Sequence, residues 1–170
     1  LRDIDTIEHN AKRILNLVNQ ILDVRKIDKQ QLQLHCQQTD MVKFVNGICK
    51  MYEYNASERN ITFRFNHEDE RLEAWVDRSQ FDKVVTNLLS NAFKYSFDGG
   101  TIDVNLSHDD KNLKLQVVDT GVGLDGDSLK HIFDRFYQGT NSYLLHIDGT
   151  GIGLNLCKMI VDMHHGTIDS

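Results

Sequence analysis

A long apolar stripe at the start of the chain places the strongest constraint on its fold. Its members recur at alternating steps of three and four between positions 3 and 28: Ile4, Ile7, Ala11, Ile14, Val18 and Ile21. Four further apolar residues widen it: Leu15, Leu17, Leu22 and Val24. The pattern predicts one amphipathic helix, and its width favours a four-helix bundle over a two-stranded coiled coil. A lone helix cannot bury this stripe, so it packs on its own domain or joins a bundle. Its place at the very start favours a bundle arm.

The polar run 29–31 interrupts the stripe and predicts a domain boundary. Residues 1–28 are then part of a bundle, and residues 29–170 form a second domain. In that domain we expect a short strand around Leu32 and Leu34 and a helix capped by Asp40. The alternating segment 61–65 predicts a strand, with residues 73–77 as its hairpin partner.

The second half of the chain continues this mixture of helices and strands. A helix is expected at about 80–95, capped by Asp77 or Ser79, and two strands follow at 101–107 and 113–118, joined by a polar turn. Helices at about 128–136 and 152–164 and a strand start at 167–168 complete the pattern. Interleaved helices and antiparallel hairpins predict an α/β class protein, a two-layer α/β sandwich preceded by one long helix.

Composition excludes several classes of function. The net charge is -6 and the isoelectric point about 5.7, so a basic face for nucleic acid is not expected. No apolar run approaches the roughly 20 residues that cross a bilayer. Three widely spaced cysteines, Cys36, Cys49 and Cys157, fit reduced thiols rather than a disulfide framework or a metal site.

Two asparagines on the predicted helix 80–95 call for an explanation, because asparagine is a poor helix former. Asn87 and Asn91 are four apart and therefore share a face, and Lys94 lies one turn further on. An amide oxygen is a hard ligand suited to magnesium, and a lysine can bind phosphate. A solvent-facing polar stripe would show the same spacing.

Two glycine-bearing segments follow. Asp119-Thr120-Gly121-Val122-Gly123 comes straight after a predicted strand, where a carboxylate can accept a hydrogen bond and glycines allow a close approach of the backbone. The segment 149–153, Gly-Thr-Gly-Ile-Gly, opens the last helix, where exposed amides favour a phosphate. Neither a Rossmann fingerprint nor a P-loop fits it, because a polar loop precedes it and no Gly-Lys-Ser/Thr follows.

In this order the three segments resemble the GHKL ATP-binding (Bergerat) fold, and within it the catalytic (HATPase) domain of sensor histidine kinases. Residues 87–95 are similar to the N box, 119–124 to the first G box, 132–137 to the F box and 149–154 to the second G box. Residues 10–23 resemble the second helix of the dimerisation and histidine-phosphotransfer bundle. The run 17–26 is similar to hybrid two-component sensors of gut Bacteroidetes.

The resemblance implies a role for each matching residue. Asn91 would ligate Mg²⁺ with the support of Asn87, Lys94 would contact phosphate, and Tyr95 would pack on the nucleoside. Asp119 would bind the adenine amine, Gly121 and Gly123 would shape that pocket, and Arg135 would reach the γ-phosphate. The second G box would let a lid at about 138–148 close over the phosphates. Its residues in contact with the nucleotide would be Gly149, Thr150, Gly151, Gly153 and Leu154. Cofactors would be ATP and Mg²⁺, and the reaction transfer of the γ-phosphoryl group to a histidine.

One residue favours kinase over hydrolase. ATPases of this fold are similar to one another in carrying a glutamate base four residues before the magnesium asparagine, and that position is Asn87 here. An amide cannot accept the proton from water. The alternatives are a GHKL serine kinase of the anti-sigma type, which lacks a preceding bundle helix, and a nucleotide-sensing pseudokinase.

The histidine that accepts phosphate is expected outside residues 1–170. In the family it stands in a His-Glu-x-x-x-Pro motif, and this sequence contains no proline. The 170 residues alone are therefore not expected to autophosphorylate, and we expect the fold's last strand to be truncated. Implied partners are the phosphoacceptor bundle of the same kinase, a response regulator receiver domain and a second copy in a homodimer. The implied location is cytoplasmic, in a parent anchored in the inner membrane.

Overall fold

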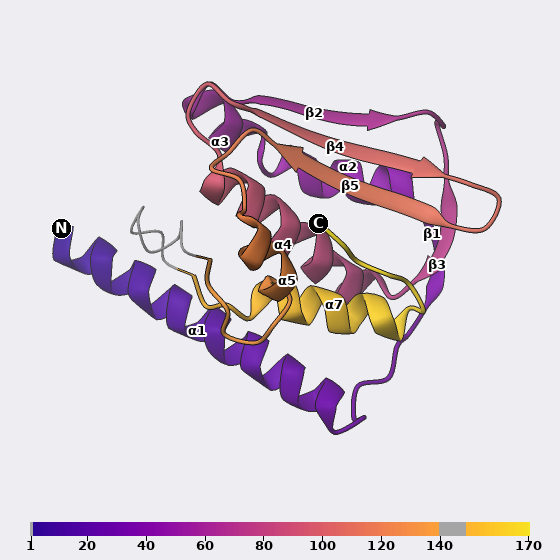
Figure 1. Ribbon diagram of the computed structural model, residues 1–170, viewed down its shortest axis with the longest axis horizontal. Coiled ribbons are helices and arrows are strands. Elements are labelled where there is room, and N and C mark those ends of the chain that lie inside the picture. Colours follow the sequence, from indigo (N-terminus) through magenta and orange to yellow (C-terminus); the bar gives the residue numbers. More distant parts are fainter. Residues whose placement is uncertain (1, 140–148) are drawn as a thin grey trace.

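The computed structural model describes residues 2–139 and 149–170. Its elements follow one another as α1 (Arg2–Asp28), β1 (Gln37–Asp40), α2 (Met41–Lys50), α3 (Glu53–Glu58), β2 (Thr62–His67), β3 (Glu73–Val76), α4 (Arg78–Tyr95), β4 (Thr101–His108), β5 (Leu113–Asp119), α5 (Gly126–His131) and α7 (Gly153–Met163). Figure 1 shows the β2, β4 and β5 strands on one side of the molecule, with helices α4 and α7 below them and α1 furthest from the sheet. The predicted α/β class with a leading helix is confirmed.

The main sheet has three strands in the order β2-β4-β5. Strands β2 and β4 are parallel, with Thr62 opposite Thr101, while β4 and β5 are antiparallel, with Ile102 opposite Asp119. Strand β1 pairs with β3 in a separate antiparallel ribbon. Because β2 and β4 are parallel neighbours, the chain between them must return along one face of the sheet in a crossover connection, and α4 is part of that connection.

Strand β4 explains why the described helices cover one face of the sheet and leave the other polar. Its buried residues Ile102, Val104 and Leu106 alternate with polar residues. On the polar face Asp103 pairs with Arg64, and Asn105 accepts a hydrogen bond from Asn66. The apolar face packs on α2 and α4 in the first core, whose fully buried members include Met41, Val45, Val85, Leu89 and Val104.

A second core lies between α4, α7 and α1. It contains Val84, Ile152, Leu156, Cys157 and Ile160, and Val24 of α1 closes it with Leu17 and Ile27 packed around. Burial raises the pKa of the Cys157 thiol to about 12, and burial followed by the nearby Glu53 carboxylate raises that of Cys49 to about 11. These two cysteines are inert core residues, in agreement with the sequence.

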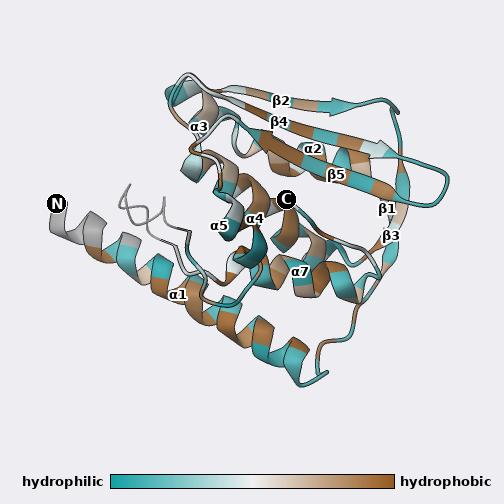
Figure 2. Cartoon of the chain, viewed as in Figure 1, coloured by the Kyte–Doolittle hydropathy of each residue, from teal (hydrophilic) through white to brown (hydrophobic). Residues whose placement is uncertain are grey.

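Helix α1 therefore packs on the domain with one face only. The predicted stripe points mostly the other way: Ile7, Ile14, Leu15, Val18, Ile21 and Leu22 are each at least 43% exposed. The side chain of Ile4 lies outside the described residues. Apolar and polar residues alternate along α1 in Figure 2. The helix thus uses a minor face for its own domain and leaves the major face exposed, and the bundle interpretation of that exposed face stays a prediction.

Several expected elements differ from the structure. The strand expected around Leu32 and Leu34 is absent, and β1 begins at Gln37 instead. Just before β1, His35 donates its backbone N–H to the Asp77 carboxylate at 2.8 Å. Residues 73–77 are not the hairpin partner of 61–65, since β3 pairs with β1. The helix expected at 128–136 ends at His131, where a contact of 2.7 Å from His131 Nδ1 to Asp134 Oδ2 closes a turn.

The last residues of the chain also differ from the expected pattern. Residues 167–170 form no strand, although Ile168 packs on the second core. Over the part of the chain that the structure describes, no helix has both the length and the apolar character needed to cross a bilayer.

Candidate functional site

A cavity of about 560 Å³ opens between α1, α4, the end of β5 and the start of α7. This is the size of a small-molecule site. Eleven of the thirteen residues predicted from the sequence line it: Asn87, Asn91, Lys94, Tyr95, Asp119, Gly123, Gly149, Thr150, Gly151, Gly153 and Leu154. The structure thus brings together segments that are up to 67 positions apart (87 to 154) in the sequence.

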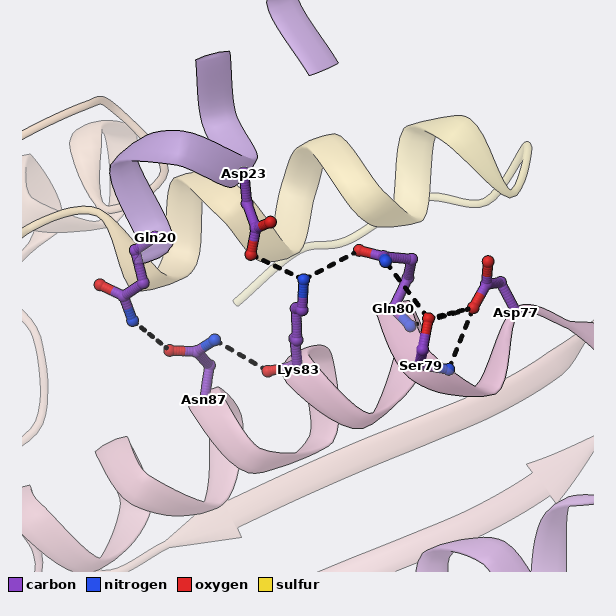
Figure 3. Close-up of polar contacts among 7 residues, drawn as sticks. All are labelled: Gln20, Asp23, Asp77, Ser79, Gln80, Lys83 and Asn87. Carbon is purple, nitrogen blue, oxygen red and sulfur yellow. Dashed lines mark hydrogen bonds and ion pairs between the residues drawn. The ribbon is translucent and has the colours of Figure 1, made fainter. Parts of the chain in front are cut away.

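Helix α4 supplies the amide wall of the cavity. The Asp77 carboxylate caps the helix by accepting hydrogen bonds from the backbone of Ser79 and Gln80. Burial opposes ionisation of Asp77, but these bonds and the one from His35 outweigh it and lower its pKa. Asn87 donates from Nδ2 to the Lys83 carbonyl at 2.8 Å, as Figure 3 shows. Its side chain is therefore fixed with the amide oxygen turned away from its own helix.

The turn after β5 is held tightly against the end of α4. Asp119 Oδ1 accepts a hydrogen bond from Gly121 N at 2.9 Å, and Val122 N donates to the Tyr95 carbonyl at 3.2 Å. A Cβ added to Gly121 would lie 2.3 Å from that carbonyl oxygen. Gly121 does not line the cavity itself, but only glycine allows this approach. Asp119 is exposed on the cavity wall, where a ligand can reach it.

The segment 149–153 forms the opposite wall. Gly151 has a φ of +67°, and a Cβ there would lie 2.6 Å from the carbonyl carbon of Phe136. A Cβ on Gly153 would lie 2.6 Å from Asn87 Oδ1, so this glycine allows α7 to start against α4. Lys94 Nζ lies 5.2 Å from the Tyr95 ring centroid and would be 3.1 Å from a Cβ on Gly149. The cation is thus held beside the glycine segment.

Arg135 lies elsewhere. Its guanidinium donates two hydrogen bonds to the Asp28 carboxylate of α1, at 2.8 and 2.6 Å. Hydrogen bonding and charge lower the pKa of Asp28 and raise that of Arg135. Arg135 lines a smaller cavity of about 200 Å³ between α1 and α7 rather than the main one, so its role at a γ-phosphate stays a prediction. Of the predicted lid, residues 140–148 lie outside the described residues, while Gln138 and Gly139 line the cavity.

The sequence reasoning missed three residues of the cavity wall, all on α1: Arg13, Asn16 and Gln20. They are spaced by three and four and therefore share one face of the helix. The recurrence of these three polar residues on one face of an amphipathic helix was the signal that could have identified them. Gln20 spans the two walls: Thr150 Oγ1 donates to its Oε1 at 3.1 Å, and its Nε2 donates to Asn87 Oδ1 at 3.5 Å.

The residues present fit a magnesium ion carried by phosphates. Among the described residues no cluster of three or more His, Cys, Asp or Glu could hold a metal ion. The cavity instead offers amide oxygens, with Asn91 on the same wall as Asn87. Mg²⁺ is typically held by one or two protein oxygens together with substrate phosphates and water. Asn91 would be the protein ligand of such an ion.

Comparison with known proteins places this site in a family. Residues 76–170 match the family model described as histidine kinase-, DNA gyrase B-, and HSP90-like ATPase. The chain belongs to this family. All eleven predicted residues that line the cavity fall within the matched range, as do the tight turn at Gly121 and the ion-paired Arg135.

Individual relatives of this ATPase family extend the likeness to α1. Histidine kinase P4 of Formosa agariphila is 33% identical over 165 residues, which are 95% of this chain and 12% of that protein. The structure of full-length ShkA in complex with AMPPNP has a TM-score of 0.80 at 20% identity, over 94% of this chain and 33% of that one. The structure of histidine kinase ThkA in complex with response regulator protein TrrA has a TM-score of 0.74 at 21% identity, over 96% and 44%. This chain thus spans less than half the length of each of these three proteins.

Proposed function

We propose that this chain is the ATP-binding catalytic domain of a two-component sensor histidine kinase. One observation carries the proposal: the amide face of α4, the carboxylate at the end of β5 and the glycine-rich start of α7 meet in the same cavity, the one of about 560 Å³. Asp119 offers an acceptor for the adenine amine, and the start of α7 offers backbone amides and a positive helix end for phosphates. The family membership and the histidine kinase relatives support the same function.

The surroundings of Asn87 support phosphoryl transfer to a protein over hydrolysis. Its Nδ2 is a donor to Lys83 O, and its Oδ1 is an acceptor for Gln20. An amide in this position cannot take a proton from an attacking water. The described wall includes only two carboxylate side chains, Asp119 and Asp169, and Asp119 is assigned to adenine. Slow hydrolysis is therefore expected.

In the proposed reaction a histidine ring nitrogen of the phosphoacceptor helix attacks the γ-phosphorus of ATP. A nitrogen–phosphorus bond forms, the bond from phosphorus to the β–γ bridging oxygen breaks, and ADP leaves with that electron pair. Lys94 and the amides at the start of α7 hold the phosphates in line for the attack, so positioning and charge neutralisation provide most of the catalysis. A bound Mg²⁺ would neutralise phosphate charge.

The remaining partners follow from the same proposal. The exposed apolar face of α1 fits a bundle that carries the phosphoacceptor histidine and pairs two copies of the kinase as a homodimer. A response regulator receiver domain would take the phosphoryl group from that histidine; the ThkA–TrrA complex is a likeness that supports this partner. Since ATP is cytoplasmic, the domain would lie in the cytoplasm, with the parent protein anchored in the inner membrane.

Calorimetric titration with ATP, with and without Mg²⁺, tests the proposal. Wild-type protein should bind saturably at micromolar to millimolar concentration, and Asp119→Asn should weaken binding at least tenfold, because the adenine amine loses its charged acceptor. Asp110→Asn is the matched control, because Asp110 is an exposed residue of the β4–β5 turn outside the cavity. Equal ATP affinity in all three proteins would refute the adenine site. A protein that binds ATP but does not phosphorylate a supplied histidine bundle would be a nucleotide-sensing pseudokinase.

A further inference from the structure

Helix α1 is part of the wall of the cavity, a role that its apolar stripe does not require. Arg13, Asn16 and Gln20 line the cavity from this helix, opposite residues of α4. Leu17 and Val24, which pack on the second core, lie next to this polar stripe on the helix surface. The face of α1 that meets the domain is therefore half apolar and half polar, and its polar half points into the cavity.

Two contacts fix how α1 lies along α4. Asp23 pairs with Lys83 at 2.6 Å, and Gln20 bonds to Asn87, as Figure 3 shows. Residue numbers fall along α1 as they rise along α4, so the two helices are antiparallel. Continued at about 1.5 Å per residue, this register places Asn16 at the level of Asn91 and Arg13 at the level of Lys94. All four residues line the same cavity.

The charges of the wall identify what Arg13 can bind. Across the described residues of the cavity wall, Arg13 and Lys94 are the only lysine or arginine side chains. The ATP triphosphate carries several negative charges, and the carboxylate of Asp119 is placed at the proposed adenine end. A guanidinium can bind a phosphate through two parallel hydrogen bonds, which a lysine cannot do. A cation on each side of the cavity would hold the phosphates between α1 and α4.

We propose that α1 forms an additional wall of the nucleotide site and that Arg13 binds the outer phosphates of ATP. This inference rests on the proposed function. It makes the bound nucleotide a bridge between α1 and the ATP-binding domain. Gln20 is hydrogen-bonded to Asn87 and Thr150, and these bonds fix the rotation of α1 about its axis. The rotation in turn determines whether the Arg13 side chain can extend to the phosphates. ATP affinity then depends on how α1 is seated.

The test is calorimetric titration of Arg13→Gln with ATP and with AMP, in Mg²⁺. Loss of a charge-assisted contact should weaken ATP binding about tenfold, while AMP, which lacks the outer phosphates, should change less than twofold. Arg13→Lys keeps the charge without the planar fork and should fall between wild type and Arg13→Gln. Lys12→Gln is the matched control, since Lys12 is 74% exposed, pairs with Glu8 and lies outside the cavity wall. It should bind ATP as the wild type does.

The outcomes separate this inference from the proposed function. If Arg13→Gln binds ATP as tightly as the wild type while Asp119→Asn does not, the inference is wrong and the proposed function stands. If Lys12→Gln weakens ATP as much as Arg13→Gln, the effect is one of net charge and the inference is also wrong. Wild-type protein that binds no ATP while its circular dichroism shows a folded α/β domain would refute both.

Discussion

Substitution of Gly121 by alanine tests whether the turn after β5 shapes the site. The added Cβ would lie 2.3 Å from the Tyr95 carbonyl oxygen and 2.6 Å from Asp119 Oδ1, whereas ordinary contacts begin at 3.4 Å. The turn or the end of α4 must therefore move by about 1 Å. The movement would break the hydrogen bond from Gly121 N to Asp119 and that from Val122 N to Tyr95 O.

The cost has two parts. Overpacking of this kind costs about 1–3 kcal/mol, and each of the two lost hydrogen bonds about 1 kcal/mol, so we expect the free energy of unfolding to fall by about 3–5 kcal/mol. Asp119 is displaced from its place on the wall, and ATP affinity should fall at least tenfold. A shift of this size at a site of oriented contacts is sufficient for such a loss.

Urea denaturation and ATP calorimetry measure the two effects. Gly126→Ala is the matched control, because a Cβ on this first residue of α5 meets nothing within 4 Å. It should leave ATP affinity unchanged and stabilise the protein by up to about 1 kcal/mol. Gly121→Ala protein with wild-type stability and affinity would show that the turn is free to relax, and would refute the argument from close approach.

Two further predictions concern α4 and α1. Asp77→Ala should lower the free energy of unfolding by about 1–2 kcal/mol in urea denaturation at pH 7, because two backbone N–H groups of α4 lose their cap. Since the folded-state pKa of Asp77 is lowered, its contribution is complete above the unfolded-state pKa of about 3.9 and is lost as the pH falls further, through the lower folded-state pKa; equal losses at pH 7 and pH 2 would refute this. Ile14→Glu, on the exposed face of α1, should reduce concentration-dependent self-association in sedimentation velocity, and Asn10→Glu should not. An already monomeric wild type would contradict the bundle interpretation of that face.

Local signals in the sequence predicted the long helices and the caps of α2 and α4 correctly. Asp40 was expected to cap one helix and either Asp77 or Ser79 another, and Asp40 and Asp77 accept hydrogen bonds from the first turns of α2 and α4. The hairpin of β4 and β5 was also predicted, because its polar turn and alternating strands are encoded within 19 residues. Capping and hairpin formation depend on neighbours in the chain, so the sequence displays them directly.

Strand pairing over long distances was not encoded in this way. The alternation of Phe63 and Phe65 says which face of β2 is buried but not which strand lies beside it, and the partner proved to be β4 in parallel. Helix α3 was missed because a segment of six residues is too short to show a helical period in its apolar residues. Its position depends on Ala56, which is buried in a small apolar cluster with Phe93 of α4 and Ile102 of β4.

The candidate site was predictable where residue type alone indicates chemistry. Paired asparagines on a helix, a carboxylate at a strand end and a glycine-rich helix start each required an explanation, and all line one cavity. Arg13, Asn16 and Gln20 escaped notice because polar residues on an amphipathic helix are expected to face solvent. Tertiary contacts such as the packing of Val24 and the pair between Asp23 and Lys83 decide which polar face turns inward.

Helix α1 therefore connects two surfaces that would otherwise be independent. Its exposed apolar face is suited to a partner bundle, and its polar face forms part of the cavity wall, so a rotation of the helix that alters one must alter the other. At 100° per residue, a rotation that moves Arg13 out of the cavity also displaces Gln20 from Asn87 and Thr150. By linkage, whatever changes the seating of α1 changes ATP affinity, and bound ATP favours the seated helix by the same free energy. Nucleotide binding and the geometry of the bundle would then both depend on one equilibrium, the seating of α1 on the ATP-binding domain.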